Sequence, residues 1–104
     1  MAVTTTALAR TAAATSNTTL YTVPTTSTTT VITNIAVANT AGSAGTFTIN
    51  FDGVAVLSSV AIAANTTAFF DLKQTLPANA TPKTITGSAS ATTINFHISG
   101  VEIV

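Results

Sequence analysis

Apolar and polar residues alternate with a period of two in several stretches of this 104-residue chain. In TFTINFD, residues 46–52, every second residue is phenylalanine or isoleucine and the residues between them are polar. TINFHIS, residues 93–99, repeats this order. Successive side chains of a strand point to opposite faces of a sheet, so the alternation is typical of strands with one buried face. Without any sustained helical spacing, it predicts an all-β fold.

A third stretch, TVITNIAVAN at 30–39, predicts a strand with Val31, Ile35 and Val37 on its buried face. Near the C-terminus the apolar positions change parity, from Ile94, Phe96 and Ile98 to Val101 and Ile103. Gly100 lies at this change. A β-bulge there, with φ > 0, would turn both sets toward one core. We therefore predict a core strand that runs nearly to Val104.

Turn residues separate the predicted strands. Asp52-Gly53 is the preferred pair for a two-residue type I′ hairpin, and NTAGSAG at 39–45 is typical of a loop. Pro24 ends one strand, and Pro77 and Pro82 bracket a loop. The strands are predicted near 4–10, 18–23, 30–39, 45–52, 54–58, 67–72, 83–89 and 93–103.

Eight short strands predict a single antiparallel β-sandwich, with jelly-roll topology first and an immunoglobulin-like order as the alternative. We expect residues 1–17 to form an N-terminal strand, or arm, with a linker, and residues 18–104 to form the sandwich domain. The arm is expected to reach a neighbouring molecule.

Charged residues make up only 6% of the chain, with three basic and three acidic residues and no net charge. A typical soluble surface carries about 25–35% charged residues. Leu20 to Asn39 contains none at all and is rich in threonine, which combines β-propensity with a hydroxyl group. Sheet edges with so few lysines and prolines invite pairing, so we expect a homo-oligomer, a trimer in the first instance. The neutral balance argues against nucleic-acid binding.

No apolar run approaches the roughly 20 residues that span a bilayer, and the first residues lack the pattern of a signal peptide. The sequence contains no cysteine, so a disulfide framework is excluded. We expect no membrane partner.

No residue pattern predicts catalysis, a metal or a cofactor. His97 is the single histidine, and we interpret it as a surface or interface residue because the acidic residues are scattered. Asp52 is assigned to the hairpin turn. Asp71 and Lys73 are expected to form a modest surface pair.

Three Asn-x-Thr sequons, at Asn17, Asn65 and Asn79, are attributed to the abundance of asparagine and threonine. Tyr21 and Phe69-Phe70 could line a sugar platform, but we expect these aromatic residues in the core. We predict that the protein is not an enzyme.

Several segments together resemble a group of small structural proteins in tailed-bacteriophage particles. They are LYTVP at 20–24, TTTVITNIAVANTAG at 28–42, AIAANTT at 61–67, FFDLKQTLPANA at 69–80 and GSASATTINFHISGVEI at 87–103. The resemblance implies a β-sandwich virion protein that is assembled in the host cytoplasm. It points first to a capsid decoration (cement) protein on the capsid surface, bound across junctions of the major capsid protein. The alternative is a tail-fibre or baseplate component that binds host-surface glycans.

Overall fold

The computed structural model describes residues 3–24, 28–77, 81 and 83–104. Eight strands account for most of them. None of the described residues forms a helix that is long and apolar enough to cross a membrane. The strands are β1 (Val3–Ala12), β2 (Thr18–Thr22), β3 (Thr29–Asn39), β4 (Gly45–Phe51), β5 (Val54–Ile62), β6 (Thr66–Leu76), β7 (Thr84–Ala89) and β8 (Ile94–Ile103).

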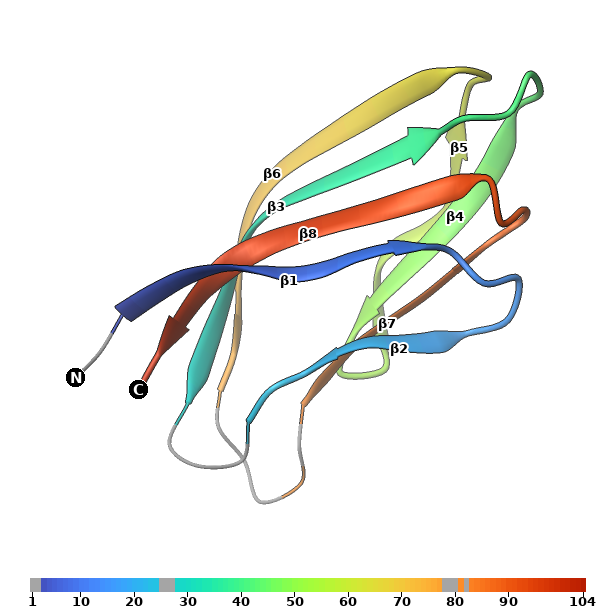
Figure 1. The fold of residues 1–104 in the computed structure, drawn as a ribbon. Coiled ribbons are helices and arrows are strands. Elements are labelled where there is room, and N and C mark those ends of the chain that lie inside the picture. The colour runs from blue at the N-terminus through green and yellow to red at the C-terminus, as the bar shows by residue number, and fades with distance from the viewer. Residues whose placement is uncertain (1–2, 25–27, 78–80, 82) are drawn as a thin grey trace.

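The strands form two four-stranded sheets, in the orders β1-β8-β3-β6 and β2-β7-β4-β5 (Figure 1). Every pairing between neighbours is antiparallel. Four of these pairings are nested: β4 with β5, β3 with β6, β2 with β7 and β1 with β8. The chain is thus one long hairpin rolled into a sandwich, which is the jelly roll. The predicted fold class is confirmed, and the immunoglobulin-like alternative is wrong.

The tip of this long hairpin is the turn between β4 and β5. Asp52 and Gly53 have φ angles of 54° and 78°, as a type I′ turn requires at both central positions. Lys83 extends its ammonium group to the Asp52 carboxylate at 2.9 Å, the one ion pair among the described residues. The turn predicted from Asp52-Gly53 is therefore confirmed.

Aromatic and branched aliphatic side chains fill the space between the sheets. Phe47 of β4 lies edge-on to Phe96 of β8 and to Phe70 of β6, with ring centroids 6.1 Å and 6.0 Å apart. These contacts join the two sheets across the middle of the sandwich. The hydrophobic side chains with no more than 1% exposure are Val23, Ile32, Ile35, Val37, Phe47, Ile49, Ile85, Ile94, Phe96 and Ile98.

The predicted faces of β4 and of the first half of β8 are confirmed, but that of β3 is partly wrong. Ile32 is buried and Val31 is half-buried on the opposite face. The cause is an irregularity between Ile32 and Asn34 in both pairings of β3, which leaves Thr33 as an extra residue opposite β8. A bulge changes the parity of a strand, so even-numbered Ile32 faces the core before Thr33, whereas odd-numbered Ile35 and Val37 face it afterwards.

The bulge predicted at Gly100 is also wrong. The extra residues lie in the two neighbours of β8 instead: Leu8 in β1 and Thr33 in β3. Gly100 does not adopt a positive φ, and β8 contains no extra residue in its pairing with β1 or β3. Gly100 therefore faces inward, whereas Val101 and Ile103 face outward.

Residues 3–12, expected as part of an arm, form the edge strand β1 and pair with β8 along its length. Leu8, Ala9 and Ala13 contribute to the core. In this monomer the first strand thus belongs to the sandwich. β5 and β6 extend further than expected, to Ile62 and from Thr66 to Leu76.

Candidate functional site

The residues that could support chemistry are separated in the structure. His97 is half-buried on the outer face of the first sheet, opposite Arg10 of β1 and Ala36 of β3. A shallow hollow of about 290 Å³ lies beside it, lined by Arg10, Thr11, Ala12, Asn95 and His97. This lining offers no carboxylate to orient the imidazole, so it lacks the parts of a catalytic triad.

The carboxylates have different partners. Asp52 is paired with Lys83, and Asp71 accepts a hydrogen bond from the Asn34 amide at 3.2 Å. The expected pair between Asp71 and Lys73 does not form. The described residues contain no group of three histidine, cysteine, aspartate or glutamate side chains that could hold a metal ion.

Glu102 has a role that the sequence did not indicate. Its carboxylate faces inward and accepts a hydrogen bond from the Tyr21 hydroxyl of the opposite sheet. The Tyr21 oxygen also lies 2.8 Å from the Thr30 hydroxyl, and Thr30 is fully buried. This polar bridge joins β2 to β3 and β8 at the end of the sandwich near the chain termini. One feature of the sequence could have indicated that Glu102 faces inward: it has an even number, like the buried Ile94, Phe96 and Ile98.

The bridge changes the ionisation of the tyrosine. The pKa of Tyr21 is raised to about 12, first because burial disfavours the charged phenolate. The hydrogen bond to Glu102 adds to the shift, because only the protonated hydroxyl can donate it to the carboxylate. The hydroxyl therefore stays a donor throughout the neutral range. The bridge is structural and presents no reactive group.

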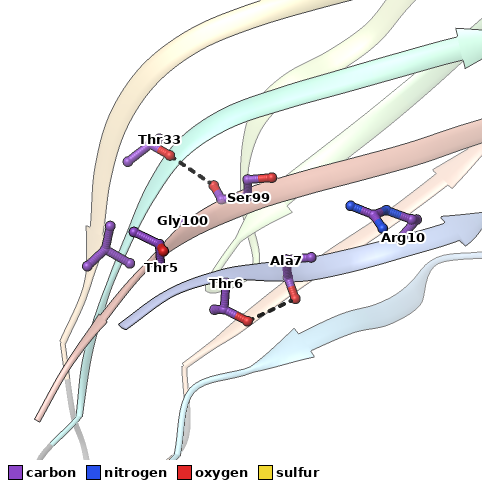
Figure 2. A pocket seen from close by; sticks show the side chains of 8 residues that line it. Thr5, Thr6, Ala7, Arg10, Thr33, Ser99 and Gly100 are labelled. Atoms are coloured by element: carbon purple, nitrogen blue, oxygen red, sulfur yellow. Dashed lines mark hydrogen bonds between the residues drawn. The ribbon is translucent and has the colours of Figure 1, made fainter. Parts of the chain in front are cut away.

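Where the bulges align, the first sheet bends and its outer face is hollowed. Figure 2 shows this region, where the Thr33 hydroxyl donates to the Ser99 carbonyl oxygen at 3.3 Å and Arg10 lies to one side. The hollow has a volume of about 370 Å³ and is lined by Thr5, Thr6, Ala7, Arg10, Thr33, Ser99, Gly100 and Val101. A neighbouring hollow of about 540 Å³ is lined by Thr33, Asp71, Leu72 and Lys73. The hydroxyl groups and single charged groups that line these hollows can form hydrogen bonds.

The aromatic residues do not form one platform. Phe69 is 72% exposed on β6, so its expected place in the core is wrong. Phe70 packs against Phe47. Tyr21 belongs to the other sheet, and its hydroxyl group donates a hydrogen bond to Glu102. A sugar platform built from these rings is therefore excluded.

Two of the three sequon asparagines lie at exposed positions. Asn17 accepts a hydrogen bond from the Asn50 amide at 3.3 Å, and Asn65 has a φ of 52° in the turn before β6. Asn79 lies outside the described residues.

Below the bend, the outer face of the first sheet carries valine, isoleucine and threonine side chains, of which Val31, Val101 and Ile103 are half-buried. Val101 and Ile103 of β8 lie directly opposite Thr5 and Val3 of β1, and Val101 also lies opposite Val31 of β3. Side chains of directly opposed residues share a face, so these five form one continuous surface. We call Val3, Thr5, Val31, Val101 and Ile103 the terminal facet. All five are β-branched and none is charged.

No protein-family model and no curated protein matches this sequence. Its fold is similar to that of solved chains from infectious bursal disease virus. A chain in the crystal structure of the T13 particle of this virus superposes with a TM-score of 0.58 at 12% identity, over 97% of the present chain and 30% of that chain. Chains of the Gx and Gt strains give TM-scores of 0.48 and 0.41, identities of 16% and 18%, and coverages of 97% of this chain and 30% and 32% of theirs.

The present chain thus spans about a third of the length of these chains. At such low identity, the similarity to the T13 particle chain establishes a shared fold. In the present chain this fold is an eight-stranded jelly roll, and the chain to which it is similar comes from a virus particle.

Proposed function

We propose that this protein is a structural component of a virus particle, specifically a decoration protein on the outside of a bacteriophage head. The observation that carries the proposal is the jelly-roll fold of this chain, which superposes on a chain of the T13 particle with a TM-score of 0.58. The dispersed histidine and carboxylates support a role without chemistry. The sequence resemblance to tailed-phage virion proteins supports the choice of a phage.

The proposed mechanism is mechanical. A decoration protein adds buried contact area across the seams between major capsid proteins, and stable contacts of this kind bury about 1,200–2,000 Å². Its surface must approach another protein closely without charge repulsion. With three basic and three acidic residues in the whole chain, this protein meets that requirement.

We further propose that the protein acts as a homotrimer. Each sheet leaves two edge strands, β1 and β6 in the first and β2 and β5 in the second. An edge strand with few charged residues pairs readily with another chain. In this arrangement residues 1–17, which include β1, would contact a neighbouring molecule.

The second candidate is a tail-fibre or baseplate module that binds host-surface glycans. The observation that favours it is the hollow at the bend, where threonine and serine residues lie beside Arg10. Hydroxyl groups and a guanidinium group can hydrogen-bond to sugar hydroxyl groups.

Binding to purified phage heads tests the first candidate. The protein is added to heads of the parent phage that lack it, and the heads are then heated or osmotically shocked. We expect saturable binding to the outer surface and fewer burst heads. Binding to tails or to host glycans, with no binding to heads, would replace the first candidate by the second.

A further inference from the structure

Arg10 of β1 is exposed and forms no ion pair with any residue that the structure describes. Two of the three acidic groups are engaged far from it or turned away. Asp52 is paired with Lys83 at the tip of the long hairpin, and the Glu102 carboxylate faces inward to Tyr21. A guanidinium group is always charged and presents several N–H donors in one plane. Arg10 is therefore available to an anion from outside the molecule.

Arg10 lies between two hollows, because it lines both the hollow at the bend and the smaller hollow beside His97. Figure 2 shows Arg10 at one side of the first hollow, with its guanidinium group directed toward it. Neither lining contains a carboxylate. His97 is directly opposite Arg10 in the pairing of β1 with β8, so two nitrogen-bearing side chains lie side by side. The surface between the hollows thus offers donors to an anion and no acidic group that would repel it.

The third acidic residue, Asp71, shares the outer face but lies at its far edge. It belongs to β6, and β3 and β8 separate this strand from β1. Neighbouring strands are about 4.8 Å apart, so the two edges are about 14 Å apart. Asp71 also accepts a hydrogen bond from Asn34 and has Lys73 two residues away on its own strand. Since charges are screened over about 8 Å at physiological salt, this carboxylate hardly opposes an anion at Arg10.

Hydroxyl groups surround the hollow at the bend. The Thr33 hydroxyl donates to the Ser99 carbonyl oxygen at 3.3 Å, and the Thr6 hydroxyl donates to the Ala7 carbonyl oxygen at 3.5 Å. Both hydroxyl oxygens can still accept hydrogen bonds. The hydroxyl groups of Ser99 and Thr5 form no hydrogen bond with a described residue, so they can donate. The hollow therefore presents both donors and acceptors, which suits the hydroxyl groups of a sugar.

Two bulges shape this hollow. Leu8 in β1 and Thr33 in β3 are extra residues, and both lie beside β8 close to Ser99. Bulges interrupt the hydrogen bonds of a sheet, and they are common next to functional sites because they change the direction of a side chain. Thr33 is one of the residues that line the hollow. The bulges thus give the hollow both its shape and one of its hydroxyl groups.

We infer that the surface around Arg10 binds an acidic sugar, a monosaccharide unit that carries a carboxylate or sulfate group. The guanidinium group donates two parallel hydrogen bonds to the anionic group, and the hydroxyl groups at the bend bind those of the ring. A nucleic acid fits less well, because a single arginine neutralises only one phosphate. An acidic peptide would leave the hydroxyl groups at the bend unused. The inference rests on glycan binding, the second candidate of the proposed function, and adds the class of sugar.

Two probes that differ in one group test this site. Methyl glucuronide carries a carboxylate where methyl glucoside carries a hydroxymethyl group. Amide chemical shifts of the labelled protein measure the binding of each probe. We expect the glucuronide to shift the amides of Arg10, Thr33 and Ser99 and to bind about tenfold more tightly, because charge-assisted hydrogen bonds are the stronger ones. Methyl glucoside 6-sulfate should bind in the same way.

Arg10→Gln should weaken glucuronide binding about tenfold and leave glucoside binding unchanged. Lys73→Gln is the matched control, since it removes a positive charge from the opposite edge of the same sheet and should affect neither probe. Thermal unfolding verifies that each variant is folded. If Arg10→Gln is unfolded, Ser99→Ala replaces it, and this variant should weaken the binding of both probes.

Four results would overturn the inference: no binding of either acidic probe, equal binding of glucuronide and glucoside, a folded Arg10→Gln that binds the glucuronide like the unchanged protein, or equal shifts caused by sodium acetate. Equal binding of the two glycosides would still support the second candidate function. Binding to phage heads is measured separately. A protein that binds heads but no sugar contradicts the inference and leaves the decoration role intact.

Discussion

Both halves of β8 alternate apolar and polar residues, but they place the apolar residues on opposite faces of the sheet. In the first half, alternate isoleucine and phenylalanine side chains are completely buried, and substitution there should damage the fold. In the second half, the apolar side chains lie outside and a hydrogen-bonded carboxylate lies inside. The comparison shows that periodicity identifies a strand, but an alternation that continues without a bulge can bring apolar residues to the outer face.

The largest expected effect is on the first half of β8. Phe96→Ala removes a fully buried ring that packs against Phe47, and we expect a loss of about 3–5 kcal/mol in the free energy of unfolding. Val101→Ala is the matched change in the second half and should cost much less. Chemical denaturation of both proteins measures the difference. Equal losses would show that the two halves are buried alike.

The next largest effect is expected at the bend itself. A Cβ atom on Gly100 would overlap the Val31 carbonyl oxygen and lie 2.9 Å from the Leu8 side chain. Gly100→Val should therefore destabilise the fold by about 1–3 kcal/mol, as overpacking does, although φ is not positive. Gly42→Val is the control, because nothing lies within 4 Å of the Cβ position there. A fall in melting temperature for Gly100→Val no larger than that for Gly42→Val would contradict the close approach.

The second half of β8 can be followed by the titration of Tyr21, which is hydrogen-bonded to Glu102 in the polar bridge. The chain has one tyrosine and no tryptophan, so ultraviolet absorbance follows Tyr21 alone. We expect a pKa of about 12 in the folded protein and about 10 in denaturant. The folded protein holds the phenolic proton more tightly, so this contribution to stability is complete below about pH 10 and is lost toward pH 12.

Glu102→Gln tests the cause of this shift. It removes the carboxylate charge but keeps a hydrogen-bonding side chain, so the pKa of Tyr21 should fall toward its usual value while burial keeps part of the shift. Asp71→Asn is the control, since Asp71 lies on the outer face and bonds to Asn34. An unchanged Tyr21 titration in Glu102→Gln would mean that the carboxylate does not contact the phenol.

The smallest effect is expected at His97. It lies on the outer face in the first half of β8, and no carboxylate lines the hollow beside it. His97→Ala should leave stability within about 0.5 kcal/mol of the unchanged protein, as surface changes usually do, and should leave head binding intact. A folded variant that no longer binds heads would identify a contact at this position.

Much of the fold could be predicted from local sequence. The alternation in TFTINFD and TINFHIS predicted two core strands, and Asp52-Gly53 predicted the tip of the hairpin, because each depends on neighbouring residues alone. The faces of Val31, Val101 and Ile103 could not be predicted in this way. Val31 faces outward because its own strand contains the extra residue Thr33, and Val101 and Ile103 face outward because β8 contains no bulge. Thr33 and Leu8 look like ordinary strand residues in the sequence.

The candidate surfaces were less predictable than the fold for the same reason. The contact between Tyr21 and Glu102 joins residues 81 positions apart in the chain, and no pattern in either segment indicates it. The terminal facet likewise needs β1, β3 and β8 to be placed side by side. The parity change at Gly100 was visible, but its interpretation required the register of both neighbouring strands.

The nested pairing of the strands also has a consequence for synthesis on the ribosome. Only β4 and β5 can pair as soon as they emerge, because the turn that joins them is two residues long. β3, β2 and β1 must wait for partners that are made progressively later, and β1 waits until β8 has been translated. Loop-closure entropy likewise makes this outermost pair the last to form. The threonine hydroxyl groups of β1 can remain hydrated while this strand has no partner. Such a strand is suited to a fold in which β1 pairs only with β8.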